Sequence, residues 1–121
     1  MIICDEVIED KRTCKKSLIG LFDKILAVKL PASHKSLHVF FSLVGGLGKY
    51  KTILQYTYLK EMKVIGQIHG EVQFSDPRAI LECDFELVDV LFPYEGSYNF
   101  QILVEGEPII ERIFEVLQIK K

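Results

Sequence analysis

The chain has 121 residues, of which 49% are hydrophobic and 26% are charged, and its formal net charge is -2 at pH 7. This length fits a single domain over residues 1–121, and the composition excludes a disordered chain. Because no basic face accompanies the slightly acidic balance, we expect neither nucleic acid nor a membrane surface as a partner.

The stretch SLIGLFDKILA, residues 17–27, fits two structural templates. As a helix it would gather one apolar stripe, made of Leu18, Leu21, Phe22, Ile25 and Leu26. As a strand it must break near Asp23 and Lys24, as happens at a bulge or at a bend between two sheets. Gly20 and Pro31 disfavour the helix, and a turn over residues 9–16 would pair the strand with residues 2–8. We therefore predict a bent strand.

From Leu37 onward, apolar and polar residues alternate with the period of two that is typical of strands. Glycine and proline clusters at residues 45–48, 75–77, 93–96 and 105–108 can reverse the chain between these runs. The last run, residues 109–119, is apolar on both faces. Strands at this spacing, with no long helical run between them, indicate an antiparallel sandwich or barrel. Of the two we predict the sandwich: an all-β, antiparallel β-sandwich of immunoglobulin-like type with about seven or eight strands.

Two segments share a Gly-x-Tyr pattern where a strand begins. Gly48 and Tyr50 occupy the same places in one segment as Gly96 and Tyr98 in the other. A tyrosine just inside a strand can pack its ring on the core and bond its hydroxyl to a loop backbone, like the tyrosine corner of sandwich folds. We expect this device at both positions.

The first third of the chain resembles an uncharacterised bacterial family of small proteins with a Ser-Leu-Ile-Gly-x-Phe-Asp motif. The positions that carry the resemblance are Asp5, Asp10, Gly20, Phe22, Asp23, Ala27, Pro31 and His34. Cys14 and Leu30 depart from the pattern, because a glycine and an aromatic residue are common there. The resemblance implies a β-sandwich and brings no activity with it.

Several motifs invite a chemical interpretation that their context does not support. GGLGKYKT, residues 45–52, lacks the first glycine and the hydroxyl residue of a phosphate loop, so we predict a hairpin loop. His34 and His38 are four residues apart, a spacing that aligns two metal ligands only in a helix. We predict that both, together with His69, are loop or surface residues.

The acidic and thiol groups of residues 81–87 also have simple structural interpretations. Glu82, Asp84 and Glu86 alternate with apolar residues and are predicted to form one solvated strand face. Cys83 lies on the opposite side and is predicted to be a buried, inert thiol. We therefore expect no catalytic, cofactor-binding or metal-ligating residue, and we expect that the protein is not an enzyme.

We expect a non-catalytic binding or assembly module that contacts a protein partner or forms a homodimer. Basic residues cluster in the first turn and two strands carry surplus apolar residues, so the candidate contact residues are Lys11, Arg12, Lys15, Lys16, Phe40 and Leu103. Two alternatives stay open: a metal-dependent or other small hydrolase that uses His34, His38 and Asp23, and a β module that binds a small ligand.

The cysteines indicate the compartment. Cys4, Cys14 and Cys83 form no C-x-x-C pair, and their odd number leaves one unpaired in any scheme. This pattern suits a reducing environment better than a secreted disulfide framework. With no signal peptide or membrane span in the pattern, we expect the cytoplasm.

Overall fold

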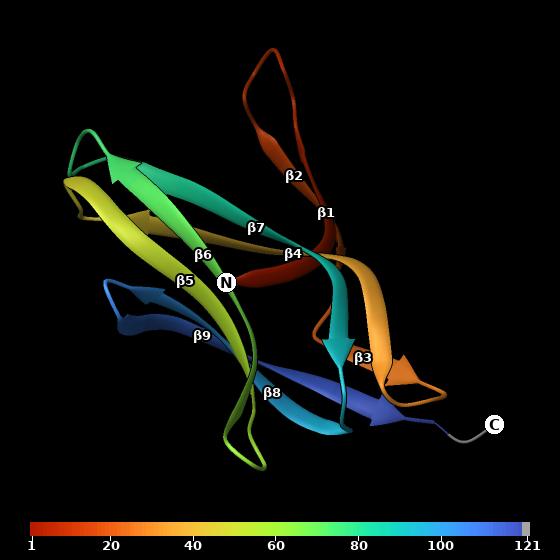
Figure 1. Cartoon of the computed structure of the whole chain (residues 1–121). Coiled ribbons are helices and arrows are strands. Elements are labelled where there is room, and N and C mark those ends of the chain that lie inside the picture. The colour runs from red at the N-terminus through yellow and green to blue at the C-terminus, as the bar shows by residue number, and fades with distance from the viewer. Residues whose placement is uncertain (120–121) are drawn as a thin grey trace.

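A computed structural model describes residues 1–119 (Figure 1). These residues contain no helix and form nine strands, one or two more than predicted. The strands are β1 (Ile2–Glu9), β2 (Lys16–Leu21), β3 (Lys24–Ala27), β4 (Ala32–Val44), β5 (Gly48–Tyr58), β6 (Lys63–Phe74), β7 (Ile80–Phe92), β8 (Gly96–Val104) and β9 (Glu107–Gln118).

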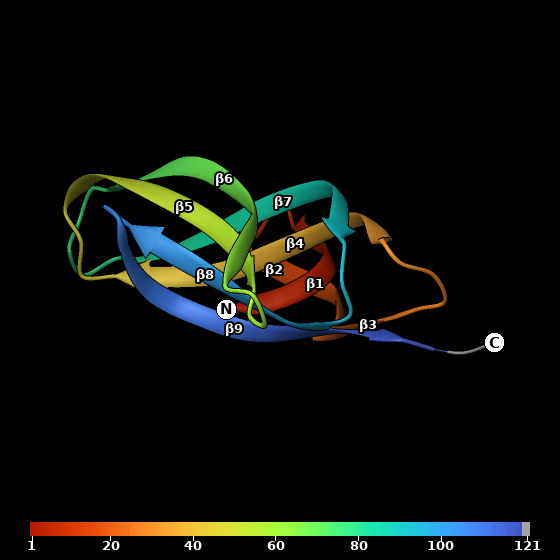
Figure 2. The ribbon, with the colours of Figure 1, turned by 60° about the horizontal axis from the view of Figure 1, so that its bottom comes forward.

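The strands form two sheets. One has the order β2-β1-β4-β7 and the other the order β3-β9-β8-β5-β6. The neighbours pair antiparallel, except that β3 runs parallel to β9. A second view shows β3 beside the end of β9 (Figure 2). An antiparallel arrangement was predicted from the sequence, but this parallel pair was not.

The ambiguous segment 17–27 is a strand that breaks between the two sheets, as predicted. Its first part is β2 in the four-stranded sheet, and its second part is β3 in the five-stranded sheet. Main-chain hydrogen bonds hold both sides of the break: Phe22 N donates to the oxygen of Ile3, and Glu115 N donates to the oxygen of Asp23, each at 3.0 Å. The break explains the extra strand in the count.

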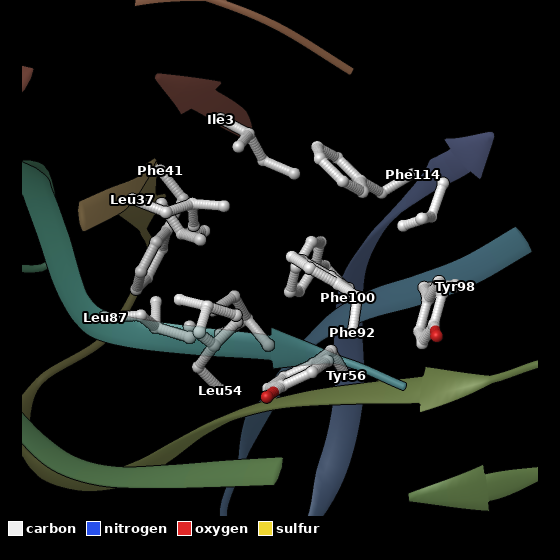
Figure 3. Packing of buried hydrophobic residues seen from close by; sticks show 14 of the residues in the cluster. Ile3, Leu37, Phe41, Leu54, Tyr56, Leu87, Phe92, Tyr98, Phe100 and Phe114 are labelled. Carbon is white, nitrogen blue, oxygen red and sulfur yellow. The ribbon is translucent and has the colours of Figure 1, made fainter. Parts of the chain in front are cut away.

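The inward residues of both sheets share one hydrophobic core. The predicted inward residues Leu37, Val39 and Phe41 are buried, as are Phe100 and Ile102 on the opposite sheet. Figure 3 shows aromatic rings at its centre, where Phe92 stacks on Phe114 with ring centroids 5.4 Å apart. Each such side chain stabilises the fold by about 1.5–3 kcal/mol when fully buried. This core therefore holds the two sheets together.

Both tyrosines of the Gly-x-Tyr pattern bind a loop backbone, which confirms that prediction. The Tyr98 hydroxyl accepts from Tyr94 N at 3.0 Å and donates to the oxygen of Tyr94 at 2.7 Å. The Tyr50 hydroxyl accepts from Leu47 N at 3.2 Å. The two bonds of Tyr98 fix the turn that leads from β7 into β8.

The prediction of a hairpin loop within residues 45–52 is wrong. This loop joins β4 of one sheet to β5 of the other, so it is a connection between sheets. The local pattern of glycines allows a reversal, but strand pairing decides where the chain goes next. Here β4 pairs with β7, and β5 pairs with β6 and β8.

A two-stranded arm leaves the body of the molecule. β1 pairs with β4 only from Ile2 to Cys4, whereas its pairing with β2 continues to Glu9 and Lys16. We call residues 5–20 the arm, and Figure 1 shows it projecting from the sheets. Gly20 lies at its base with φ +72°, where a Cβ atom would collide with the Asp5 carboxylate. The arm thus contributes no residue to the shared core.

Candidate functional site

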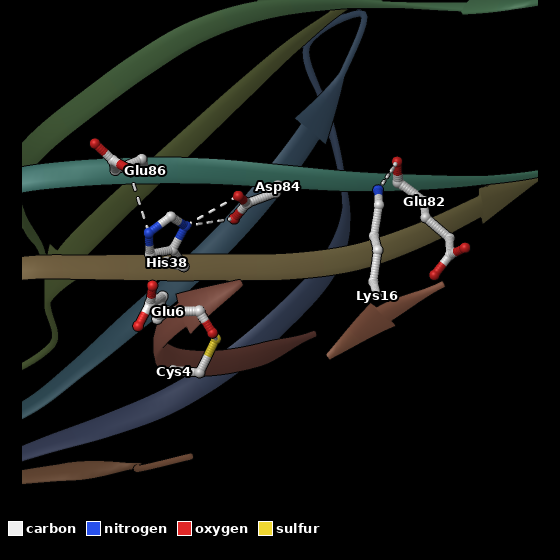
Figure 4. A network of polar contacts seen from close by, with 7 residues as sticks. All are labelled: Cys4, Glu6, Lys16, His38, Glu82, Asp84 and Glu86. Atoms are coloured by element: carbon white, nitrogen blue, oxygen red, sulfur yellow. Dashed lines mark hydrogen bonds and ion pairs between the residues drawn. The ribbon is translucent and has the colours of Figure 1, made fainter. Parts of the chain in front are cut away.

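The most densely connected polar cluster is centred on His38, in the middle of β4 (Figure 4). Its Nδ1 lies 2.9 and 3.1 Å from the two carboxylate oxygens of Asp84, and its Nε2 lies 3.3 Å from Glu86 Oε2. Both carboxylates come from β7, where Glu86 is directly opposite His38. Both contacts can be hydrogen bonds only when both ring nitrogens carry a proton.

Cys4 of β1 lies beside this cluster, opposite His38 in the strand register. It is fully buried, and its Sγ donates to the main-chain oxygen of Glu6 at 3.6 Å. Burial raises the pKa of the Cys4 thiol, and the Asp84 carboxylate raises it further. A thiol with a raised pKa is a weak nucleophile at neutral pH, so the cluster is better suited to holding strands together than to covalent catalysis.

The prediction that His38 is a loop or surface residue is wrong. Only 8% of it is exposed, and it lies within a strand. In the alternating pattern, His38 occupies a position that faces away from the core. The carboxylates of the neighbouring strand nevertheless enclose its ring. His69 is exposed, as predicted. The row of Glu82, Asp84 and Glu86 that was predicted as a solvated face is exposed, and it also supplies the partners of His38.

His34, His38 and Asp23 do not converge on one site. His34 has its own carboxylate, Asp5, at 3.1 Å, and its ring lies 5.1 Å from that of Phe22. Asp23 lines a separate surface hollow with Lys24, Ile113 and Glu115. Across residues 1–119, no group of three or more His, Cys, Asp and Glu side chains is arranged to hold a metal ion.

The turn at the tip of the arm is organised by Asp10. Its Oδ1 accepts from Arg12 N at 2.8 Å and from Thr13 N at 3.3 Å. The candidate contact residues Lys11, Arg12 and Lys15 are all exposed around this turn. Lys120 and Lys121 lie outside the described residues.

Two further candidates, Lys16 and Phe40, lie together on the outer face of the four-stranded sheet. Lys16 Nζ is 5.7 Å from the centroid of the Phe40 ring and 3.5 Å from the main-chain oxygen of Glu82. Both residues are half-buried. Leu103, the last candidate, is half-buried in β8 of the other sheet, so the candidates belong to two separate surfaces. Cys83 is also half-buried, and burial raises the pKa of its thiol.

The edge of β2 is a candidate contact surface that was not predicted from the sequence. Free sheet edges attract other strands, and charged side chains usually block them. Among the described strands, β7 carries three alternating carboxylates, β6 carries Lys63 and Glu71, and β3 is only 4 residues long. By contrast, β2 has no charge from Ser17 to Leu21. The run was visible in the sequence, but its place at an edge was not.

A family described as "Family of unknown function (DUF6941)" matches residues 1–117. No curated protein and no solved structure matches the chain. The match agrees with the expected membership of a family of unknown function and brings no activity, so function must be argued from the geometry. No helix within residues 1–119 has the length and apolar character to cross a membrane.

Proposed function

The chain belongs to the family of unknown function DUF6941, and we propose that it is a non-catalytic assembly module that forms a homodimer through the edge of β2. The observation that carries this proposal is the uncharged free edge of the arm. Ile19 and Leu21 are 46% and 63% exposed there, and Ile8 on the neighbouring strand is 43% exposed. An isolated two-stranded hairpin is only marginally stable in water. A strand from a second copy would satisfy its free backbone groups and cover its apolar side chains.

The sequence of β2 suits pairing with itself. In a two-fold antiparallel pair centred on Ile19, the Ile19 side chains of the two copies lie opposite each other, and Ser17 of one copy lies opposite Leu21 of the other. The same register brings Lys15 of each copy towards Asp23 of the other. Unlike charges therefore approach each other, and no like charges lie directly opposite within the strand. This complementarity favours a second copy over an unrelated strand.

The mass of the protein in solution tests this proposal. We expect a dimer by light scattering at tens of micromolar, and a monomer for Ile19→Lys with an unchanged circular dichroism spectrum. Ile113→Lys is the matched control, because Ile113 is 48% exposed, much as Ile19 is, but lies on β9. A monomeric parent protein, or an Ile19→Lys variant that stays dimeric, would contradict the proposal.

A second interface is favoured by the outer face of β9. Ile109, Ile113 and Leu117 form an exposed row there, and Leu26 of β3 is paired with Leu117. Leu103 lies on the neighbouring strand β8. The same experiment separates the two surfaces, since a dimer held by this face would dissociate in the Ile113→Lys variant and persist in the Ile19→Lys variant.

We also infer that the two sheets form an immunoglobulin-like sandwich. The strands β1, β4 and β7 correspond in order to A, B and E of that fold, and β5, β8 and β9 to C, F and G. The bond from Tyr98 at the start of β8 to Tyr94 corresponds to the tyrosine corner. The strand order and the tyrosine corner together support this inference of an immunoglobulin-like sandwich.

The remaining features support binding over catalysis. His34 and His38 each face a different carboxylate, and the Cys4 thiol is buried. The alternative of a small-ligand module has its best support in a cavity of about 430 Å³ between the β4–β5 loop and the β8–β9 turn. Cys4, Cys14 and Cys83 are all free thiols, which supports the proposal of a reducing, cytoplasmic location.

A further inference from the structure

A groove lies between β6 and β7, which are the free edges of the two sheets on one side of the core. Its volume is about 420 Å³. We call it the β6–β7 groove; its apolar lining comprises Phe41, Val72, Leu81, Cys83 and Phe85, and it also includes Thr52 and Gly70. Val72, Leu81, Cys83 and Phe85 are only partly buried. Apolar surface is therefore left open between two strands whose outer edges have no neighbour in the described sheets.

An unsatisfied polar group lies in the same groove. Thr52 is 1% exposed, and its Oγ1 has no hydrogen-bond partner. A buried hydroxyl without a partner is costly, and such groups are rare in native proteins. Gly70 lies opposite Thr52 on β6, so no side chain covers the hydroxyl from that strand. The groove thus combines apolar walls with one buried hydroxyl that has no hydrogen-bond partner.

We propose that the β6–β7 groove takes up an extended peptide strand of a protein partner, which pairs with the free edge of β7. A strand fits better than a small molecule because the edge of β7 offers main-chain donors and acceptors along 13 residues.

The carboxylates of β7 oppose pairing with an uncharged or acidic strand, so they specify a basic partner. Glu71, Glu82 and Asp84 all belong to its lining. The side chains of an added strand alternate between the two faces of the sheet. The partner strand therefore carries lysine or arginine on its outer face. On its inner face it carries apolar residues and one hydroxyl residue that bonds to Thr52.

Binding of a fluorescein-labelled peptide of sequence Lys-Val-Lys-Thr-Lys-Val-Lys tests the proposal. We expect saturable binding that weakens with added salt and that protects amides of β7 from hydrogen exchange. The same peptide with N-methyl groups on both its valines and its lysines, which removes donors from both edges of the strand, should not bind. Equal binding of the methylated peptide, or no binding of the parent peptide at millimolar concentration, would overturn the proposal.

Variants of the buried threonines locate the contact. Thr52→Val should weaken binding of this peptide about five- to tenfold, the value of one neutral hydrogen bond. It should leave unchanged the binding of a peptide in which valine replaces the threonine. Thr57→Val is the control, because Thr57 is also buried on β5 but is not part of the groove. An equal effect of both variants would contradict contact with Thr52. Ile19→Lys should not alter peptide binding, so this result is independent of the proposed homodimer.

Discussion

At the scale of single residues, the two Gly-x-Tyr tyrosines differ in how much their hydroxyls contribute. Tyr98 is fully buried and bonds twice to Tyr94. Tyr98→Phe leaves both main-chain groups without that partner, so we expect the free energy of unfolding to fall by about 1–3 kcal/mol. Tyr50→Phe removes one bond to an exposed amide that water can replace, and should cost about 0.5 kcal/mol or less. Urea denaturation measures both, and equal losses would contradict this interpretation.

The three thiols should react at different rates. Cys14 is exposed at the tip of the arm, Cys83 is half-buried and Cys4 is buried. Burial raises the pKa of Cys4 and Cys83, which lowers their thiolate fractions. In the folded protein we expect a thiol-specific disulfide reagent to modify Cys14 first and Cys83 slowly, with Cys4 reacting only after denaturant is added. Mass spectrometry of the modified peptides assigns the order; early modification of Cys4 would show that the arm exposes it.

The Tyr98 bond could be predicted from the sequence, whereas the environment of His38 could not. The tyrosine partner is four residues away, within reach of a local pattern. His38 and Asp84 are separated by 46 positions, and only the register of β4 against β7 brings them together. The alternation placed each of them on a polar face. It could not show that β4 and β7 are neighbours, so that their polar residues lie on the same face of one sheet.

At the scale of elements, the arm should open independently of the core. Its residues pair only with one another beyond Cys4, whereas β4 and β8 are paired on both sides. We expect arm amides such as those of Val7 and Ile19 to exchange with solvent at rates that do not depend on low denaturant concentrations. The amides of Val39 and Phe100 should follow global unfolding. Equal protection of the two groups in the monomeric Ile19→Lys variant would show that the arm is part of the cooperative unit.

Most individual strands could be predicted, because their residues alternate between the core and water. Residues 81–87 show this clearly, with acidic residues on one face and apolar residues on the other. The break in segment 17–27 was also visible, since the apolar pattern slips near Asp23. Apart from the pairing of β1 with β2 across the first turn, the partner of each strand was not visible. Pairing depends on contacts between distant residues, which alternation within one strand does not record.

At the scale of the whole molecule, the same limitation explains the missed candidate sites. The uncharged run of β2 and the apolar lining of the β6–β7 groove are ordinary strand sequences. They become candidate contact surfaces because β2, β6 and β7 lie at sheet edges. Edge position is a property of the completed topology, so it follows only once both sheets are assembled. In the same way, the parallel contact with β9 makes β3 the opposite edge strand of the five-stranded sheet.

The stability of the whole molecule should fall at alkaline pH because of its buried tyrosines. Burial raises the pKa of Tyr56 and Tyr98 above the ordinary value of 10.0. Below that value, folded and unfolded chains both keep these protons, and the stability is fully present. As the pH rises towards the folded pKa, the unfolded chain releases its protons first, so unfolding becomes more favourable. Each tyrosine contributes a slope of at most about 1.4 kcal/mol per pH unit.

Urea denaturation between pH 9 and pH 11 tests this dependence. We expect the free energy of unfolding to decrease across this range, and to decrease less steeply in Tyr98→Phe, which has one fewer buried phenol. Tyr56→Phe should also make the decrease less steep, because burial raises the pKa of Tyr56 as well. Parallel curves of the free energy of unfolding against pH for all three proteins would contradict this prediction. They would mean that other groups cause the loss of stability at alkaline pH.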